Sequence, residues 1–533
     1  MSIVDQSFFF TPLERDNIAH AKSLTSPRAS ILTTLLYPLW SRVGQHIPET
    51  VAPNAITLVG TLATVQAYYL VSQYFHTQPT AAAIIAAILL LVSAICGALD
   101  GVHARRYATG SPLGDIFSKI CGSTNHVFQA LTLLNVIGFE TTLISPDAII
   151  GRPNGSLSNT AAAAAATSAA VDSVWVKWNV LLALQLVEFL LILGRLANTV
   201  RNPLEKSLAG TVLGMVSYGI RESEISSSLM LVLFGRVMFP SFAEIARLWL
   251  VQYSGAVYST LMIVCLASLL LVGRKIMPPQ RRWTIFFCIS LRCLPMVLLL
   301  PLNTTSDLTV FSDAVVVSLL TVEVYVSHIA SRRIHAAVIF ICCMSLVNAL
   351  TTVALVIFYL VGMLADLSYS TRIPLFVPIR NVFIDGVYDL CHIGHKKVMK
   401  HALQFGNRLL VGVLSDEDCI GYKRRPVMTT EERCREVESC RFVSEVIVGS
   451  PVDGLTEEFL KKHNIHVVVC GEEYDKPDDK YYAVPRRLGI LKTAPRTEGM
   501  STSVLIKRIQ EANQEELVAK DKLRGDSVVK DGA

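Results

Sequence analysis

A long run of residues without any charged side chain constrains this chain more than any other feature of its sequence. Between Thr50 and Leu99 there is no Asp, Glu, Lys or Arg. A helix needs about 20 apolar residues to cross the hydrocarbon core of a bilayer, so this run can supply two crossings with a break near residues 73–80. The run argues against a disordered chain and against a wholly water-soluble one.

Further apolar stretches follow, and we expect about eight to ten membrane-spanning helices in all. The later stretches are 124–144, 176–195, 208–220, 227–242, 256–273, 284–301, 309–329 and 335–366. The last contains about 30 uncharged residues, or about 45 Å of straight helix, so we expect it to be tilted or broken. The low-complexity segment 151–173 predicts a loose loop between spans.

Charged residues divide the chain into two parts. They make up about 11% of the first 380 residues and about 32% of the rest. We therefore expect an N-terminal interfacial segment (1–49), a transmembrane domain (50–367), a linker (368–380), a water-soluble domain (381–512) and a charged tail (513–533). The small positive net charge belongs to the membrane part, where basic loops set orientation, so it does not indicate nucleic-acid binding.

The cysteines and the N-terminus exclude two further classes. The twelve cysteines contain no C-x-x-C pair, which predicts reduced thiols and neither a zinc site nor a disulfide framework. Residues 1–30 lack a basic start followed by an apolar stretch, so we expect no cleaved signal peptide.

A polar motif ends the second expected span and continues past it. It resembles the D-x-x-D-G-x-x-A-R-x8-G-x3-D-x3-D signature of CDP-alcohol phosphotransferases, and residues 53–60 and 111–114 resemble its choline/ethanolamine branch. In active members, the four carboxylates hold two divalent metal ions against the CDP pyrophosphate. The matching residues here are Asp100, Gly101, Ala104, Arg105 and Gly114.

Of the four carboxylates in that signature, only Asp100 is present. The other three positions hold Gly97, Ser118 and Gly122. Two dications need several oxygen ligands, so we expect no more than weak metal binding at Asp100 and no phosphotransfer. In the favoured alternative Asp100 and Arg105 form a buried ion pair or polar network in a retained scaffold; in the other, Asp115 helps to support residual activity.

After residue 380, short apolar runs alternate with amphipathic segments. Strands are expected at 382–384, 408–414, 442–448, 466–470 and 489–494, and helices at 394–406, 430–440, 455–463 and 502–512. This order predicts a doubly wound α/β domain with a parallel sheet of about five strands, whose ligands bind beyond the strands' carboxyl ends. The whole chain is thus expected to be a polytopic α-helical membrane domain followed by an α/β domain.

Two histidines follow the first of these strands, in the segment from Asp385 to His395 (DGVYDLCHIGH). A strand–loop–helix junction offers backbone amides and a helix N-terminus to a phosphate. Two imidazoles there can donate hydrogen bonds to the charge that develops in phosphoryl transfer. Zinc is a poorer explanation, because no third ligand has suitable spacing.

The histidine motif resembles the H-x-G-H signature of cytidylyltransferases. Residues 496–503 (RTEGMSTS) resemble that family's R-T-E-G-I-S-T-S, and Lys423 with residues 430–433 is similar to its lysine loop and E-R pair. The resemblance implies attack by a phosphomonoester on the α-phosphate of CTP, with release of pyrophosphate and with Mg²⁺ carried by the nucleotide.

The resemblance also assigns individual roles. Catalytic roles are expected for His392, His395, Lys423 and Arg496. Nucleotide contacts are expected for Gly394, Arg433, Thr497, Gly499, Ser501 and Thr502, with loop bracing as the alternative for Arg433.

Substrate recognition is expected around Asp385. It lies where choline and ethanolamine members carry an acid that faces the substrate ammonium, which disfavours glycerol phosphate. Residues 443–446 and 482–490 resemble ethanolamine-phosphate cytidylyltransferases more than choline enzymes, so we expect phosphoethanolamine, with phosphocholine as the alternative. The walls of this site are expected to be Tyr388 and Tyr474, together with Tyr481 and Tyr482.

The two resemblances describe consecutive steps of one pathway. The sequence predicts an integral membrane cytidylyltransferase whose front domain contacts membrane lipid but catalyses no reaction. The expected membrane is that of the endoplasmic reticulum. Since CTP is cytosolic and Arg105 and Arg106 fit a cytosolic loop, the C-terminal domain is expected in the cytosol. Ethanolamine enzymes usually carry two such domains, so a homodimer would restore the pair. The alternatives are a bifunctional enzyme and a non-enzymatic transport or lipid-binding protein.

Overall fold

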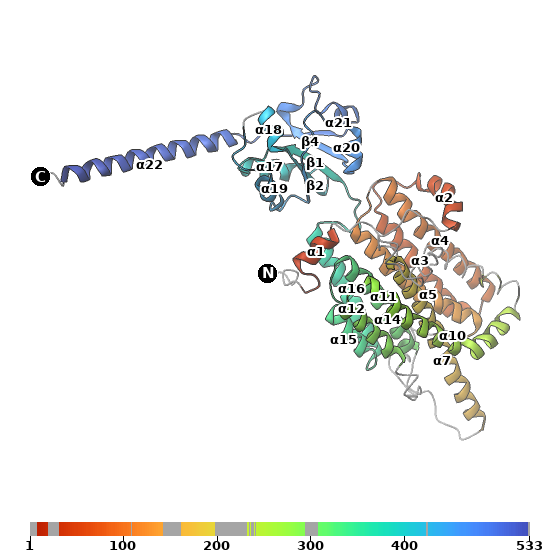
Figure 1. Ribbon diagram of the computed structural model, residues 1–533. Helices are drawn as coiled ribbons and strands as arrows, with labels where there is room; N and C mark the ends of the chain where they lie inside the picture. The colour runs from red at the N-terminus through yellow and green to blue at the C-terminus, as the bar shows by residue number, and fades with distance from the viewer. Residues whose placement is uncertain are drawn as a thin grey trace. The chain divides into compact units, whose positions relative to one another are not determined.

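The computed structural model describes residues 8–19, 31–107, 109–141, 161–197, 241–293, 307–422 and 425–530, with a few single positions between 232 and 239. The chain forms two compact units (Figure 1). The first comprises Met1–Thr371 with Leu375–Pro378, and the second comprises Arg372–Pro374 with Ile379–Ala533.

The first unit is helical. In the described residues its helices are α1 (Pro12–Ala19), α2 (Ile31–Gly44), α3 (Pro53–Tyr74), α4 (Pro79–Arg106), α5 (Pro112–Ile137), α7 (Ala161–Ala197), α10 (Ser241–Leu271), α11 (Gly273–Ile276), α12 (Pro279–Ser290), α14 (Asp307–Ile329), α15 (Ala336–Met344) and α16 (Ala349–Thr371). Five of them, α1, α3, α4, α5 and α12, begin at proline, whose fixed φ suits the first helical position.

Six helical segments of the described chain are long and apolar enough to cross a membrane: Pro53–Tyr74, Pro79–Arg106, Ser173–Ala197, Ser241–Ile276, Asp307–Ile329 and Ala349–Thr371. The expected stretch 208–220 and most of 227–242 lie outside the described residues. The expected 335–366 stretch is broken between α15 and α16, as one of the two alternatives predicted.

Two boundaries of the helical unit differ from expectation. Segment 151–173 was expected to be a loop, but α7 begins at Ala161, because alanine has the highest helix propensity of any residue and the run contains six in succession at 161–166. Helix α16 continues to Thr371, into the expected linker.

The second unit is a doubly wound α/β domain. Its strands are β1 (Asn381–Gly386), β2 (Arg408–Val413), β3 (Glu445–Val448), β4 (Val467–Gly471) and β5 (Leu491–Ala494). All four pairings are parallel and the order is β3-β2-β1-β4-β5. The five-stranded parallel sheet predicted from the sequence is confirmed.

Helices α17 (Ile393–Ala402) and α19 (Thr430–Glu438) pack on one face of this sheet, and α20 (Glu457–Lys462) and α21 (Ala483–Arg487) pack on the other. The unit also contains α18 (Asp416–Tyr422) and α22 (Thr502–Lys530), and α22 extends away from the sheet (Figure 1). Val382 packs with residues of α17 and α19 on one face, while Phe383 packs with residues of α20 on the other. Burial on both faces explains why the three central strands, β2, β1 and β4, contain continuous apolar runs rather than alternating ones.

The chain reverses its winding between β1 and β4. Strands β2 and β3 lie on one side of β1, and β4 and β5 lie on the other. In such sheets a crevice opens beyond the carboxyl ends of the two central strands, and ligands bind there. The loop after Gly386 therefore lies at the expected place for a site.

Candidate functional site

His392 and His395 are held by the N-terminus of α17. The Nδ1 atom of His392 accepts a hydrogen bond from the Gly394 N–H at 3.1 Å, and Nδ1 of His395 accepts one from the His392 N–H at 3.3 Å. Because each Nδ1 is an acceptor, the neutral ring carries its proton on Nε2. The rings stack with their centroids 4.0 Å apart, so the pair presents two Nε2–H donors.

Burial lowers the pKa of the His392 imidazole below its ordinary value. Desolvation disfavours the charged form, so His392 is neutral near pH 7. A neutral ring with an Nε2 proton can donate a hydrogen bond to a phosphate oxygen that gains negative charge. Its Nδ1 atom takes no part in this, because it accepts the hydrogen bond of Gly394 in the helix cap.

Gly394 is required by the same cap. A Cβ at this position would lie 2.8 Å from Cε1 of His392 and 3.7 Å from the backbone oxygen of Met500. The first distance is too short for any other residue. The second shows that the segment before α22 lies against the histidine loop.

The N-terminus of α22 is joined to that loop. Thr502 Oγ1 donates to the backbone oxygen of Asp389 at 3.2 Å, and Ser501 Oγ accepts from the Val504 N–H at 3.3 Å. Gly499, just before the cap, has φ +70°, which glycine adopts without strain. Two helix N-termini thus lie near one loop, and both favour an anion.

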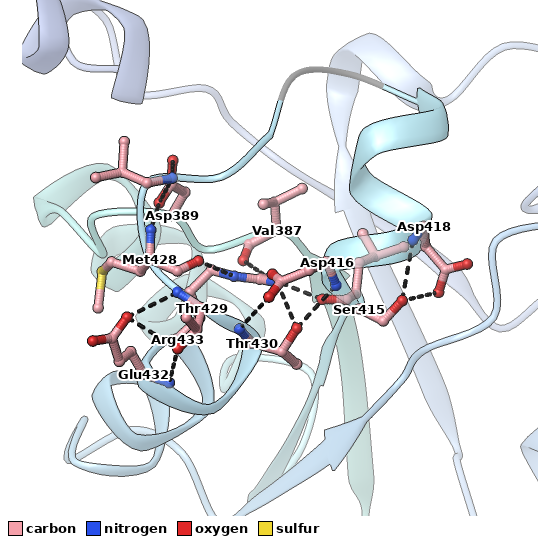
Figure 2. A network of polar contacts seen from close by, with 12 residues as sticks. Val387, Asp389, Ser415, Asp416, Asp418, Met428, Thr429, Thr430, Glu432 and Arg433 are labelled. Atoms are coloured by element: carbon pink, nitrogen blue, oxygen red, sulfur yellow. Dashed lines mark hydrogen bonds and ion pairs between the residues drawn. The ribbon is translucent and has the colours of Figure 1, made fainter.

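Arg433 connects three loops of the site (Figure 2). Its side chain is fully buried. Its Nη1 donates to the backbone oxygens of Val387 at 2.7 Å and Leu414 at 2.9 Å. Its Nε donates to Met428, and its Nη2 donates to Asp416 and Thr430. These five contacts match the five N–H donors of a guanidinium, so they favour bracing over nucleotide contact.

Asp389 forms a second anchor in the same network. Its carboxylate accepts hydrogen bonds from the N–H groups of Val427 and Met428, at 3.0 to 3.1 Å. Asp389 is buried, and it precedes His392 by three residues. The loop that carries the histidines is therefore fixed to the segment at Val427 and Met428. Lys423 and Arg424, a few residues before that segment, lie outside the described residues.

Asp385 lies at the end of β1 between two tyrosine hydroxyls. Tyr482 donates to Oδ1 at 2.9 Å, and Tyr481 donates to Oδ2. Burial raises the pKa of the Asp385 carboxyl, although these hydrogen bonds oppose the effect. The Tyr481 hydroxyl also lies 2.9 Å from the backbone oxygen of Pro451, in the loop after β3.

Tyr388 links this acid to the histidines. Its buried ring packs edge-on against His395 with centroids 5.2 Å apart, and it lies 3.3 Å from where a Cβ at Gly386 would be. Its φ of +56° is unusual for a bulky residue. Such strain is often kept at functional sites.

Other predicted residues lie in the same unit, nearer its surface. Arg496 and Gly499 are exposed, and Tyr474 is 38% exposed. Burial raises the pKa of Tyr474, Glu473 adds to the rise, and the Arg496 charge opposes it. Lys423 lies outside the described residues, and the nucleotide contacts expected for Thr497, Gly499, Ser501 and Thr502 stay predictions. The sequence did not point to Asp389 and Asp416 as anchors.

The phosphotransferase-like motif lies on α4 and α5 of the helical unit. Thr57 Oγ1, on α3, donates to Asp100 Oδ2 at 2.7 Å, and Arg105 is exposed. A Cβ at Gly114 would lie 3.1 Å from Oδ1 of Asn54, so glycine permits close packing there. Among the described residues, no group of three or more His, Cys, Asp or Glu side chains is arranged to hold a metal ion.

Comparison with known proteins assigns the class of the second unit. A family model described as cytidylyltransferase-like matches residues 383–508. The chain is 35% identical over 138 residues to an ethanolamine-phosphate cytidylyltransferase of Arabidopsis thaliana, covering 24% of this chain and 32% of that protein. A Dictyostelium discoideum protein of the same name is 38% identical over 134 residues, covering 25% and 37%.

A choline-phosphate cytidylyltransferase A of Homo sapiens is 40% identical over 136 residues, covering 25% of this chain and 36% of that protein. The chain thus spans about a third of the length of these curated relatives. The part of the second unit that carries the H-x-G-H motif is therefore similar to cytidylyltransferases, in agreement with the resemblance noted in the sequence. The family match does not reach residues before 383.

Proposed function

We propose that the chain is a membrane-anchored CTP:phosphoethanolamine cytidylyltransferase, which makes CDP-ethanolamine and pyrophosphate for phospholipid synthesis. The observation that carries this proposal is the pair of Nε2–H donors on His392 and His395 at the N-terminus of α17. Similar proteins named as ethanolamine-phosphate and choline-phosphate cytidylyltransferases support the same chemistry.

The reaction follows from this arrangement. A phosphomonoester oxygen attacks the α-phosphorus of CTP, the bond to the β-phosphate oxygen breaks, and pyrophosphate leaves. Negative charge grows on the equatorial oxygens of the α-phosphate, where the two imidazoles donate hydrogen bonds. Lys423 and Arg496 supply cationic contacts to the triphosphate and the phosphomonoester. No covalent intermediate is required.

Mg²⁺ is expected to arrive with CTP, held by the phosphates. The described residues offer no carboxylate cluster for a resident ion, so the proposal assigns no protein ligand to it. Its contribution is to offset phosphate charge, while the histidines and helix termini orient the α-phosphate.

Phosphoethanolamine is the preferred substrate because of the groups around Asp385. The carboxylate and the two tyrosine hydroxyls offer oxygen atoms, to which a primary ammonium can donate hydrogen bonds. A quaternary ammonium cannot donate and is usually held by aromatic faces, and the loop at 449–454 has no aromatic residue. Phosphocholine is the alternative, since choline-phosphate relatives match equally well.

The helical unit is proposed to anchor the enzyme in the endoplasmic reticulum membrane, with the second unit in the cytosol and with homodimers possible through pairing of second units. Its six apolar helical segments support a membrane location. We propose that this unit keeps a phosphotransferase-like scaffold without its reaction. Protease protection of the C-terminus in sealed microsomes would contradict the orientation.

The activity test is direct. Purified full-length protein is incubated with labelled CTP and, separately, phosphoethanolamine, phosphocholine or glycerol 3-phosphate. We expect labelled CDP-ethanolamine as the main product and little product with glycerol 3-phosphate. A preference for phosphocholine would replace the substrate assignment, and no product with any phosphomonoester would remove the proposal.

A further inference from the structure

Arg281 is a buried arginine of the helical unit, and one of its three side-chain nitrogen atoms has no hydrogen-bond acceptor in the described chain. It lies in the first turn of α12 and is 5% exposed, and its Nε is buried with no acceptor. Other buried arginines of the described helical unit are paired, Arg292 with Asp313 and Arg332 with Glu323. A buried N–H group without an acceptor is unfavourable, so an anion that accepts a hydrogen bond from Arg281 Nε would stabilise this arrangement.

The charges around Arg281 do not neutralise it. Glu323 attracts it and Arg332 repels it. Glu323 is already engaged, because Arg332 Nη2 donates to both its oxygens at 2.9 and 3.0 Å, and Tyr359 donates to Oε2 at 2.9 Å. The Glu323–Arg332 pair is therefore close to neutral as a unit, and the charge of Arg281 is left unmatched.

Two further nitrogen donors lie beside Arg281. Arg282 follows it in the chain, and its Nε is also buried without an acceptor, with its guanidinium 5.5 Å from the centre of the Trp283 ring. His328, in the last turn of α14, interacts electrostatically with Arg281. Helix α12 begins at Pro279, so its positive end is at the same place.

We propose that Arg281, Arg282 and His328 form a binding site for a phosphate group. Guanidinium groups match the geometry of phosphate oxygens and form charge-assisted hydrogen bonds with them. Two candidate membrane spans, Asp307–Ile329 and Ser241–Ile276, end beside these residues. The phosphate can come from a lipid headgroup or from free phosphate, and the chemistry of the site is the same for both.

The test measures thermal unfolding of the full-length protein in detergent, titrated with short-chain phosphatidic acid, inorganic phosphate or diacylglycerol, which carries no phosphate. We expect phosphatidic acid to raise the unfolding midpoint in a saturable way and diacylglycerol to have no effect. A matching rise with inorganic phosphate would identify free phosphate as a ligand, and its absence would identify the lipid headgroup. Equal effects of phosphatidic acid and diacylglycerol, or no effect of either phosphate compound, would overturn the proposal.

Two variants distinguish phosphate binding at this site from a general effect of positive surface charge. Arg281→Gln should abolish the rise, whereas Arg274→Gln, which removes an exposed charge on α11, should keep it. Without ligand, Arg281→Gln should unfold at the same temperature as the parent or higher, because an unmatched buried charge has been removed. A lower midpoint together with an unchanged response to phosphatidic acid would show a purely structural role. If Arg281→Gln fails to fold, Arg282→Gln should weaken binding by about tenfold, the effect of one lost charge-assisted hydrogen bond, and unchanged binding there would refute the site.

Discussion

Arg433 and Asp416 form an ion pair in which a fully buried guanidinium meets a carboxylate that is 40% exposed, with Nη2 and Oδ1 2.5 Å apart. The pair joins helix α19 to Asp416, the first residue of helix α18. Burial alone would raise the pKa of Asp416, but hydrogen bonds from Arg433 and Thr430 lower it below the ordinary value. Most of the guanidinium's contacts are to backbone oxygens, so its structural role does not depend on the exposed acid alone.

Replacing Arg433 should loosen the loops that it connects. Arg433→Met leaves the backbone oxygens of Val387, Leu414 and Met428 without a donor, and each buried unsatisfied group costs about 1–3 kcal/mol. We expect faster hydrogen exchange in β1 and β2 of the full-length protein. Arg435→Met on the same helix removes only an exposed pair with Glu431 and should change little, about 0.5 kcal/mol. Equal exchange in the two variants would refute the bracing role.

Replacing either site histidine should slow the reaction. His392→Asn keeps an acceptor for the helix cap, because asparagine is a good N-cap residue, but it lacks the Nε2–H donor. We expect a fall in kcat of about two orders of magnitude or more, with a smaller change in KM. His463→Gln, outside the site, should have nearly normal kinetics. A normal kcat in His392→Asn and His395→Asn would eliminate the assigned mechanism.

The state of His392 should depend on pH in a defined direction. Burial lowers its pKa in the folded protein, whereas an unfolded histidine titrates near about 6.5. The unfolded chain therefore binds the proton first as pH falls, so this contribution to folding stability decreases below about pH 6.5 and is fully present above it. Protonation of Nδ1 also breaks its bond with Gly394. NMR titration of labelled histidine rings, assigned with His392→Asn, should give a pKa below 6.5, and a pKa above that value would contradict the neutral donor.

Asp385 should govern binding of the phosphomonoester rather than CTP. Asp385→Asn keeps the shape of the side chain but removes the charge that faces the ammonium. We expect KM for phosphoethanolamine to rise about tenfold or more, as for a lost charge-assisted hydrogen bond, and KM for CTP to stay within about twofold. Asp478→Asn, an exposed acid of the same unit, is the matched control. The same KM for phosphoethanolamine in both variants would place the ammonium elsewhere.

The sequence predicted the sheet well because its central strands, β1, β2 and β4, contain short apolar runs between turn residues. The expected strand at 382–384 is the centre of β1, and the run after Arg408 is β2. Helices α18 and α21 were not predicted, since α18 starts with three acids and α21 has five residues, too few for a periodic pattern. Helix α22 was expected to end near residue 512 but continues to Lys530, because helix formers such as Glu, Lys, Leu and Ala fill the expected tail.

The histidines could be predicted because motif and helix start coincide in the chain. The contacts by which Asp389 and Asp416 anchor the loops of the site could not be predicted. Asp389 binds amides at Val427 and Met428, and Asp416 binds Thr430 and Arg433, so each contact joins residues that are far apart in sequence. No local spacing or composition marks such pairs, and only the fold brings them together.

The helical unit is expected not to transfer phosphoethanolamine from CDP-ethanolamine to diacylglycerol, even with Mg²⁺ or Mn²⁺ present. Three positions of the signature hold Gly97, Ser118 and Gly122 instead of carboxylates. One oxygen of Asp100 already accepts a hydrogen bond from Thr57, and Gly97 has no side chain that could supply a ligand. A two-metal clamp on a pyrophosphate needs the negative charge that these residues lack.

The measurement uses purified full-length protein with radiolabelled CDP-ethanolamine and diacylglycerol, beside an Asp100→Asn variant. We expect no labelled lipid from either protein while the cytidylyltransferase reaction continues in both, because Asp100 belongs to the helical unit and the histidines to the α/β unit. Labelled lipid that disappears in Asp100→Asn would show that one carboxylate, aided by Asp115, is enough to hold the pyrophosphate. The chain would then catalyse both steps, with the product of the α/β unit as the substrate of the helical one.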